Sequence, residues 1–488
     1  MIVTNIAVTV EYSKIKDLSF GELCGAVYEM VLELGRNIVE EVVEETGKEV
    51  HATRDDKKYE DKGYRTTTIK TKLGDVRCKR RVYRNRFAEG DEAKYVYLVD
   101  EAMKIEKVGK IEKGFCIEMA ETVMEGTFRS AAKNVKDNSG THLSAMGVWN
   151  AFQALGECRE KEIARLSELE KKDKGPGEVA TKILYTESDG VWLKLQGNSR
   201  KAYGPSKEMK MGIAYDGVLY AGGKGNEKSR RVLDTKVAYA TMESSDVFRR
   251  GKDAVVAGTY RTDEVELWVM NGDGAQWISK TDKKNTISVL DEYHRNKAIT
   301  RCVRDTEIAK QIFGLLHENN VPQLMGYLEA MTNSLEGPDR ESMKELHRYF
   351  KENEDSLLGY YDRGITIPET RDPSIHHARL GSMESNVFTL IGNRMKDGRA
   401  CWSVSGANHM ALLLCLYHTT GLDDLALKLE PLDLTEETEE DLDDYIFDGN
   451  PPSGNVPYSV GKGYNGFRTA EIPIEEFWLK DIAKIQRL

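Results

Sequence analysis

The sequence predicts an α/β protein in which a mixed sheet is flanked by helices and interrupted by a long helical insertion. Three observations predict this fold class. Strand-like apolar segments recur between residues 181 and 291, helical periodicity dominates residues 296–364, and a basic, alternating segment at residues 62–86 precedes both. The 488 residues suffice for two or three domains, each with a core of its own.

Composition sets limits on the class of protein and its compartment. The chain is 31% charged and 40% hydrophobic, as in an ordinary soluble protein. The N-terminus lacks the features of a signal peptide and no stretch is long and apolar enough for a membrane span, so we expect a cytoplasmic protein without a membrane partner. The seven cysteines include no CxxC pair, which argues against a disulfide framework and against a structural zinc site.

Residues 62–86 form a strongly basic segment with ten Lys or Arg residues and the single acid Asp75. Alternation on both sides of Gly74 and Asp75 predicts a β-hairpin. Such a ribbon can follow a phosphate backbone, or it can pair with acidic helical residues such as those at 40–45, and the segment alone leaves both readings open. The residues assigned to DNA here are Arg65, Lys70, Lys72, Lys79, Arg80, Arg81 and Arg84.

Residues 127–157 predict two helices joined by a turn at residues 138–140, with Ser144 as the candidate N-cap of the second helix. The apolar face of that second helix is expected to comprise Met146, Val148, Trp149, Phe152 and Leu155. The arrangement resembles a helix-turn-helix, although any αα-hairpin gives a similar pattern. If this region is a helix-turn-helix, we expect Ser144 and Asn150 to contact DNA. A charged helix follows and ends at the Gly-Pro-Gly break of residues 175–177, which is the expected domain boundary.

The next part of the chain predicts strands and helices in the order β-β-β-α-β-α-β, which indicates a mixed sheet flanked by helices. The strands are expected at residues 181–190, 208–217, 236–242, 265–274 and 286–291. One helix is expected at residues 244–258 behind a Ser cap, and a short one is expected from Ala275 onward.

Two aspartates mark the ends of predicted strands. Asp189 is expected to end the first strand, and Asp273 to end the fourth, between Gly272 and Gly274. The first and fourth strands are commonly neighbours in a sheet of this order, so the two carboxylates are expected to meet. Adjacent carboxylates repel unless a cation lies between them, and hard oxygen ligands select Mg²⁺ or Mn²⁺. Taken singly, each acid is also explained as an ordinary residue of an SDG or GDG turn.

A third acid is expected after the helical insertion. Residues 379–403 predict a helix that Ser382 caps and Gly398 ends, with Trp402 beyond it. Glu384 lies in the first turn of this helix and is the candidate third acid. The helix dipole alone also favours an acid at that position, so the local pattern leaves both explanations open.

Several stretches together resemble bacterial insertion-sequence transposases of the ISLre type, formerly classed as an uncharacterised protein family and similar to Mutator-like DDE transposases. The resemblance covers nearly the whole chain. The stretches that carry it are KGYRTTTIKTKLGDVRCKRRVYR, SAMGVWNAFQALGE, YTESDGVWLKLQG, MGIAYDG, NGDGAQWI, DEYHRNKAI, GSMESN and WSVSGANHMA.

The resemblance implies an RNase H-like catalytic domain with a DDE triad and two Mg²⁺ or Mn²⁺ ions. Carried over by motif, the catalytic and metal-binding triad falls on Asp189, Asp273 and Glu384. The C/D-x-x-H motif of such relatives corresponds to Asp291 and His294, which are accessory candidates, and Trp402 is a candidate for stacking on DNA ends. The implied partners are the terminal repeats of an element, target DNA and further copies of the chain on DNA.

Two other functions stay open at this point. One is an RNase H-like nuclease or resolvase that cuts strands without joining them, and the other is a domesticated DNA-binding regulator. The expected domains are an N-terminal helical region (1–60), the basic hairpin (61–100), a helix-turn-helix-like region (101–175), a first catalytic part (176–295), the helical insertion (296–375), a last catalytic part with the Glu helix (376–430) and an acidic, Pro/Gly-rich tail (431–488).

Overall fold

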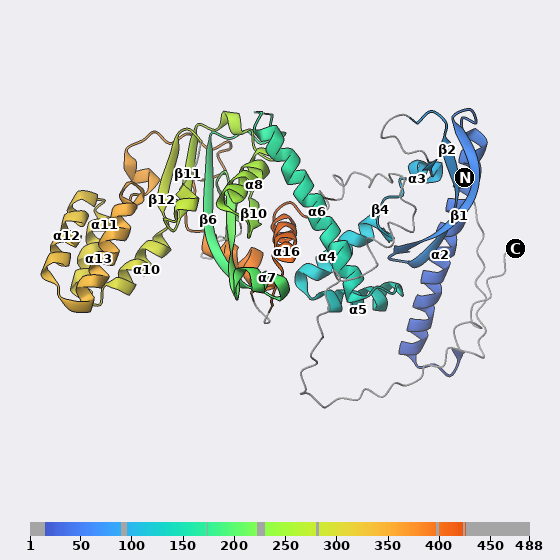
Figure 1. Cartoon of the computed structure of the whole chain (residues 1–488), viewed down its shortest axis with the longest axis horizontal. Helices are drawn as coiled ribbons and strands as arrows, with labels where there is room; N and C mark the ends of the chain where they lie inside the picture. Colours follow the sequence, from blue (N-terminus) through green and yellow to red (C-terminus); the bar gives the residue numbers. More distant parts are fainter. Residues whose placement is uncertain are drawn as a thin grey trace. The chain divides into compact units, whose positions relative to one another are not determined.

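The computed structural model describes residues 15–88, 95–172, 174–221, 230–279, 283–396, 400–422 and 425. These residues divide into two compact units (Figure 1). The N-terminal unit holds the described residues of Met1–Val123 and Thr127–Ala151, and the sheet unit holds those of Met124–Gly126 and Phe152–Leu429. The change from one unit to the other between Ala151 and Phe152 falls inside a helix. Gly398 and the acidic tail lie outside the described residues.

A long helix opens the N-terminal unit. Helix α2 (Phe20–Thr53) begins with a capping box, in which the Ser19 side chain accepts from the Glu22 N–H and the Glu22 carboxylate accepts from the Ser19 N–H at 2.8 Å. Its buried Val43 packs against Ile69, Val76 and neighbouring apolar residues of the hairpin that follows. This small core fixes one face of the hairpin against the helix.

The basic hairpin is confirmed. Strands β1 (Tyr59–Thr71) and β2 (Gly74–Asn85) pair antiparallel, with Lys70 opposite Asp75. Gly74 has a φ of 112°, which a residue with a side chain rarely adopts, and so the tight turn requires glycine there. The short strands β3 (Tyr95–Val96), β4 (Lys107–Val108) and β5 (Ile111–Glu112) complete a sheet of order β3-β2-β1-β5-β4.

Four helices follow: α3 (Leu98–Met103), α4 (Lys113–Glu125), α5 (Phe128–Ser139) and α6 (Ala145–Glu170). Gly140 ends α5 in the left-handed conformation, and Ser144 Oγ accepts from the Gly147 N–H at 3.0 Å at the start of α6. The two predicted helices are therefore present. The predicted apolar face of α6 needs correction, because Met146 and Trp149 are 56% and 38% exposed while Val148, Phe152 and Leu155 are buried.

A five-stranded mixed sheet forms the centre of the sheet unit. Its strands are β6 (Ile183–Lys194), β7 (Ser206–Tyr215), β10 (Val237–Thr241), β11 (Leu267–Gly272) and β12 (Thr286–Leu290). They lie in the order β10-β7-β6-β11-β12. The β10–β7 and β7–β6 pairs are antiparallel, and the β6–β11 and β11–β12 pairs are parallel. The prediction that the first and fourth strands are neighbours is confirmed.

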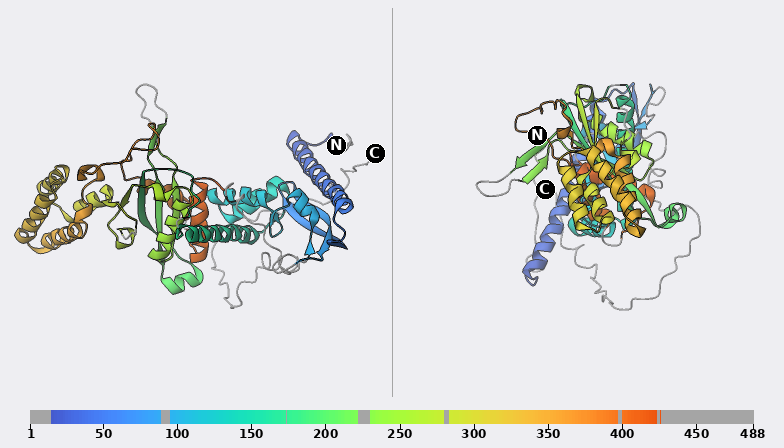
Figure 2. Two further views of the ribbon diagram at one scale, coloured as in Figure 1. Left: turned by 90° about the horizontal axis from the view of Figure 1, so that it is seen from above. Right: turned by 90° about the vertical axis from the view of Figure 1, so that its left-hand side faces the viewer.

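Helices cover this sheet. Helix α8 (Ser245–Ala257), capped by Ser244, packs its buried Phe248 with Leu184 of β6 and Tyr239 of β10 in one core. Helix α16 (Val404–Tyr417) contributes Leu412 to the same core. Two elements that the sequence did not predict are α7 (Gly197–Tyr203) and the hairpin of β8 (Val218–Ala221) and β9 (Arg230–Leu233), which projects from the main sheet (Figure 2).

The helical insertion forms a core of its own. Its helices are α10 (Glu292–Cys302), α11 (Thr306–His317), α12 (Val321–Ser334) and α13 (Gly337–Glu352), followed by the short turns η2 (Glu354–Ser356) and η3 (Tyr360–Arg363). Ile312, Leu324, Leu346 and Phe350 are fully buried among them. The sequence prediction of a helical insertion is confirmed by these four helices.

The predicted Glu helix is present but irregular. It runs as α14 (Met383–Asn386), the π-helical turn η4 (Val387–Gly392) and α15 (Asn393–Met395). The prediction that Ser382 caps it is wrong, because the Ser382 side chain makes no capping hydrogen bond; its Oγ accepts instead from Arg231 Nη2 at 2.5 Å. Two shorter helices, η1 (Thr262–Glu264) and α9 (Gln276–Ser279), flank β11. None of the helices in the described ranges combines the length and apolar character needed to cross a membrane.

Candidate active site

Asp189 lies within β6 and not at its end, which corrects the sequence prediction. The strand continues to Lys194, and Asp189 pairs with Met211 of β7. The SDG sequence does not turn here because β7 supplies a ladder partner for Gly190 as well, at Lys210. Asp189 is partly exposed, and its Oδ1 accepts from the Gly190 N–H at 2.7 Å. The strand backbone on both sides of Asp189 therefore fixes the position of this carboxylate.

Asp273 follows the end of β11 on a constrained turn. The last parallel pair joins Asn271 of β11 to Glu187 of β6, and so Asp273 lies two residues beyond it, as Asp189 does on β6. The Asp273 Oδ1 accepts from the Ala275 N–H at 2.9 Å. Gly274 has a φ of 89°, and a Cβ at this position would lie 2.6 Å from the Asn353 side chain, so glycine is required on both counts. The two acids occupy equivalent positions on neighbouring strands.

His294 lies beside these acids. Its Nε2 is 3.7 Å from Asp189 Oδ2. The neighbouring Asp189 carboxylate is the main cause that raises the pKa of His294 above its ordinary value of 6.5, and the charges of Asp291 and Asp273 add to it against the opposing effect of burial. The imidazolium form is thus favoured at this edge of the sheet.

Asp291 has a different role from His294 within the predicted motif. It is the N-cap of α10, and its Oδ1 accepts from the N–H groups of Tyr293 at 3.0 Å and His294 at 3.2 Å. Its Oδ2 accepts from Asn271 Nδ2 at 2.8 Å. Asp291, directly after β12, therefore fixes the start of the helix that carries His294, and its bond to Asn271 ties that start to β11, the strand that leads to Asp273.

Sequence reasoning missed Glu187 and Asn271. Glu187 is fully buried two residues before Asp189, and burial raises its pKa. Its carboxylate accepts from Tyr215 OH at 2.5 Å and from Asn271 Nδ2 at 2.9 Å. The buried Asn271 Oδ1 has no hydrogen-bond partner among the described residues. The signal for Glu187 was present in the sequence, because alternation along YTESDG places it on the same face as Asp189.

Glu384 is exposed in the first turn of α14. Across the described ranges, no three His, Cys, Asp or Glu side chains are grouped closely enough to hold a metal ion. The structure thus brings Asp189 together with Asp273 and His294, and it gives no closed three-acid cluster with Glu384. The assignment of Glu384 as the third acid stays a prediction.

A pocket of about 360 Å³ adjoins Asp273 and His294. The helical insertion supplies its other lining residues, among them three basic and two acidic side chains. These residues are Lys297, Ala298, Arg301, Glu345, Arg348, Tyr349 and Glu352. Arg301 is paired with Glu345 at 2.7 Å, and Tyr349 OH donates to the Asp273 carbonyl at 2.8 Å. The pocket therefore connects the acidic edge of the sheet with the insertion.

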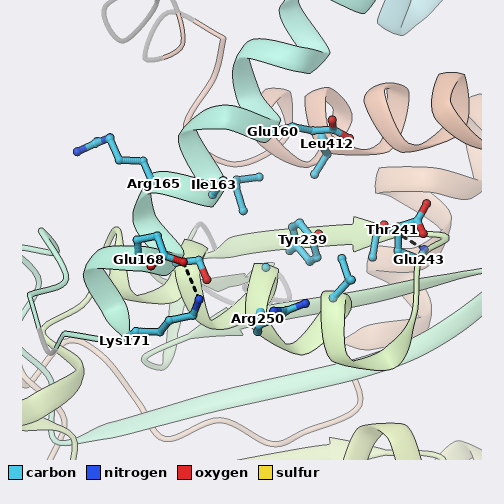
Figure 3. A pocket seen from close by; sticks show the side chains of 14 residues that line it. Glu160, Ile163, Arg165, Glu168, Lys171, Tyr239, Thr241, Glu243, Arg250 and Leu412 are labelled. Atoms are coloured by element: carbon cyan, nitrogen blue, oxygen red, sulfur yellow. Dashed lines mark hydrogen bonds and ion pairs between the residues drawn. The ribbon is translucent and has the colours of Figure 1, made fainter.

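A larger pocket of about 520 Å³ lies between α6, β10 and α8 (Figure 3). Glu160, Glu168, Tyr239, Glu243 and Arg250 line it together with apolar side chains, and Glu168 is paired with Lys171 across 2.6 Å. None of the predicted catalytic residues lines this pocket. This larger pocket and the acidic edge are consequently different places in the sheet unit.

Arg80 is not available to DNA, which corrects its assignment. It is only 1% exposed and makes an ion pair with Asp100. Its Nη2 donates to Thr67 Oγ1 at 2.5 Å, and its guanidinium lies 4.3 Å from the centre of the Tyr97 ring. Side chains alternate between the two faces of a strand, and this places Arg80 on the same face of β2 as Val76 and Cys78, which packs against α2.

The outer face of β2 carries the exposed cations of this strand. Arg77 and Lys79 are exposed there, and the sequence assignment had left Arg77 out. Arg81 is paired with Asp61 and lies over the Tyr64 ring at 4.2 Å. Arg65, midway along β1, and Arg84, near the end of β2, are also exposed.

The other residues assigned to DNA have partners within the N-terminal unit. Lys70 is paired with Asp75 at 3.2 Å and Lys72 with Glu118 at 3.0 Å. Ser144 caps α6, and Asn150, six residues further along, is partly buried. The alternative that acidic helical residues pair with the hairpin holds in part, since Glu40 of α2 accepts from the Arg77 N–H at 2.7 Å.

Trp402 is a core residue, and its assignment to DNA ends is corrected. It is 8% exposed, and its Nε1 donates to the Met395 carbonyl at 2.9 Å. This bond fixes the end of the Glu helix against the segment that precedes α16. Trp277 is also partly buried, with its ring edge-on to Phe248 at 5.0 Å, as the sequence favoured.

The fold and the site define an α/β protein with a pair of acids and a histidine at one edge of a mixed sheet. The chain matches the model of the uncharacterised protein family (UPF0236) over residues 14–428, and it belongs to that family. A UPF0236 protein of Caldanaerobacter subterraneus subsp. tengcongensis is 24% identical over 411 residues, which are 82% of this chain and 78% of the relative.

Two further relatives show how this family is distributed. Another protein of that organism, whose description covers eleven loci of one genome, is 25% identical over 411 residues, or 81% of this chain and 77% of the relative. A UPF0236 protein in the vanSb 3′ region of Streptococcus gallolyticus is 24% identical over 342 residues, or 68% of this chain and 69% of the relative. Many copies in one genome are consistent with a protein associated with insertion sequences.

Proposed function

We propose that this chain is a DDE transposase that binds the terminal repeats of an insertion element, cleaves DNA strands and transfers them. The observation that carries the proposal is the parallel pairing of β6 with β11, because it puts Asp189 and Asp273 at equivalent positions of adjacent strands. The strand order and directions agree with the RNase H-like domain that the resemblance implies. The many loci of a relative in one genome add support of a different kind.

The residues at this edge fit divalent cations in chemical kind. Asp189 and Asp273 offer carboxylate oxygens, and Asn271 Oδ1 is a buried oxygen without a partner among the described residues. Glu384 is the proposed third ligand. Two Mg²⁺ or Mn²⁺ ions held there would supply activation of the attacking hydroxyl and stabilisation of the leaving oxygen at the scissile phosphate.

The neighbouring protein groups hold charge and orient the acids. His294, with its raised pKa, places a positive charge 3.7 Å from Asp189 Oδ2 and favours the approach of a phosphate. Lys297 and Arg348 extend positive charge along the adjoining pocket. The Asp291 cap holds His294 in place, so the imidazolium stays at the edge where the phosphate would bind.

DNA binding is proposed for the N-terminal unit. The exposed Arg77 and Lys79 present positive charge on the outer face of the hairpin, where phosphate contacts supply affinity. The exposed Met146 and Trp149 at the start of α6 are in the place from which a helix-turn-helix reads a groove. We further propose that copies of the chain assemble on the two ends of the element.

The test is a cleavage assay with the full-length protein and DNA that carries the ends of its own element, taken from the sequences that flank the gene. We expect metal-dependent cleavage at those ends, followed by joining to a target plasmid, and loss of both in Asp273→Asn. Cleavage without joining would favour a nuclease or resolvase. End binding without cleavage in Mg²⁺ and in Mn²⁺ would favour a DNA-binding regulator and would overturn the transposase proposal.

A further inference from the structure

Glu187 occupies the centre of a buried polar network beside the candidate site. Its side chain is fully buried, and it lies on the same face of β6 as Asp189. A carboxylate is costly to bury unless its oxygens are hydrogen-bonded. The groups that meet this requirement identify what Glu187 does in the fold.

The partners of Glu187 come from three different segments. Tyr215 of β7 donates its hydroxyl at 2.5 Å, and Asn271 of β11 donates its amide at 2.9 Å. The Gly381 N–H donates at 2.9 Å, and the Ser382 N–H donates to both carboxylate oxygens, at 3.0 and 3.2 Å. The last two groups belong to the turn that enters α14, the helix that carries Glu384.

The turn is built to present its backbone donors to one carboxylate. Gly381 has a φ of 91°, which aims two successive N–H groups in nearly the same direction. Nothing lies within 4 Å of a Cβ built on Gly381, so the need for glycine is one of backbone conformation and not of space. Glu187 takes the place at this helix start that the Ser382 side chain leaves empty.

The same network reaches α10. The Asn271 amide that donates to Glu187 also donates to Asp291, the N-cap of the helix that carries His294. Each segment that bears a candidate catalytic residue is therefore joined to Glu187 directly or through one amide: β6 with Asp189, β11 with Asp273, α10 with His294 and α14 with Glu384.

We propose that Glu187 is a positioning residue that holds the start of α14, the helix that carries Glu384, against β6. This inference rests on the proposed function for the chemistry, but the anchoring of α14 is a property of the fold. Each carboxylate oxygen accepts from at least one N–H group, which can only donate, and so the site requires an acceptor at both oxygens. Glutamine would direct an NH₂ group at one of these donors, and aspartate would be one methylene too short to reach them all.

The test compares full-length wild type with Glu187→Gln, Glu187→Asp and a matched control, Glu208→Gln. Glu208 lies on the neighbouring strand β7, opposite Trp192 of β6, and therefore on the other face of the sheet. Melting temperature and binding of element-end DNA, both in chelator, report whether each variant folds. Hydrogen exchange of the peptide spanning residues 380–395, also in chelator, reports the anchoring without any reaction.

In Glu187→Gln we expect exchange at Gly381 and Ser382 to accelerate at least about tenfold, because charge-assisted hydrogen bonds are lost. The cleavage rate should fall about a hundredfold, as expected for a misplaced catalytic group, and half-saturation should need about tenfold more Mn²⁺. End binding should stay within about twofold of wild type. Glu187→Asp should show both losses in smaller degree, and Glu208→Gln should show neither.

Unchanged exchange in a folded Glu187→Gln would overturn the anchoring, and normal cleavage in spite of faster exchange would overturn the positioning role. Should Glu187→Gln not fold, Glu187→Asp decides by the same two readouts. If the wild type cleaves no element ends while Glu187→Gln accelerates exchange, the anchoring stands and the transposase proposal fails. The two failures are thus distinguishable.

Discussion

Asp273→Asn in chelator and in metal tests most directly whether the glycine-flanked acid is a ligand or a turn residue. Asparagine keeps the shape of the side chain, and its Oδ1 can still accept from the Ala275 N–H, so the turn should survive. Gly274 and the bond from Tyr349 OH to the Asp273 carbonyl are unaffected. The substitution therefore removes one negative charge and leaves the shape and hydrogen bonds of the turn nearly unchanged.

The magnitudes follow from the surroundings of Asp273. In chelator the lost charge relieves repulsion with Asp189 and Asp291 but also removes attraction to His294. Because Asp273 itself is partly exposed, each effect is worth about 1 kcal/mol or less. A metal at one hundred times its Kd stabilises the wild type by about 2.7 kcal/mol, which corresponds to roughly 5 °C or more in the melting temperature of a unit of this size.

Melting is followed by tryptophan fluorescence, since Trp192, Trp268, Trp277 and Trp402 all belong to the sheet unit. We expect Asp273→Asn to melt at or slightly above the wild type in chelator and to lose most of the gain in Mn²⁺. Asp263→Asn, an exposed acid of η1, controls for the change in net charge and should respond to metal as the wild type does. A variant that is destabilised in chelator and still gains the full shift would show that Asp273 is only a turn residue.

Four further outcomes are expected. Asp189→Ala, Asp273→Ala and Glu384→Ala should each abolish cleavage and leave the affinity for element ends within about threefold of wild type. Near-normal cleavage by Glu384→Ala would show that the wrong third acid was chosen. Changing Arg77 and Lys79 together to alanine should reduce the slope of log affinity against log salt by about 1.8 for two lost phosphate contacts. By contrast, Arg80→Ala should lower the free energy of unfolding by about 3–5 kcal/mol and leave the salt slope unchanged, since Arg80 is a buried ion-pair partner. Because the folded pKa of His294 is raised, its contribution to stability is complete below pH 6.5 and is lost as pH rises through that folded pKa; melting in chelator across this range should show the loss, and Asp189→Asn should remove most of it.

Periodicity predicted the elements of this chain better than it predicted what their side chains do. The hairpin turn at Gly74 and the strands around Asp273 follow from local pattern, and the pairing of β6 with β11 followed from strand order. Asp189 was placed at a strand end because SDG is a turn sequence, but the ladder with β7 overrides that preference. Arg80 was assigned to DNA from the basic composition of the segment, whereas its position in the alternation of β2 places its side chain on the buried face.

The hydrogen bonds that organise the site could not be predicted from the sequence, for a different reason. Glu187 meets Gly381 and Ser382 across nearly two hundred residues of chain, as their sequence separations of 194 and 195 show. No local period encodes such a contact. Glu187 in YTESDG and Gly381 in RLGSME can each be read from the sequence, but their pairing depends on the sheet order and on the path by which the insertion returns.

The two acids are held by different means, and this difference has a consequence for how the site would respond to a ligand. Asp189 is fixed in the middle of a strand that pairs with β7 on both sides of it, and its position cannot change without the sheet. Asp273 lies on a turn whose carbonyl accepts from Tyr349 and whose Gly274 packs against Asn353, both at the end of α13. A shift of the insertion would therefore be transmitted to one acid and not to the other. The pocket is lined by Lys297 of α10 and Arg348 of α13, and DNA bound along it would act on these two helices. The separation of the Asp189 and Asp273 carboxylates would then depend on whether the substrate is in place.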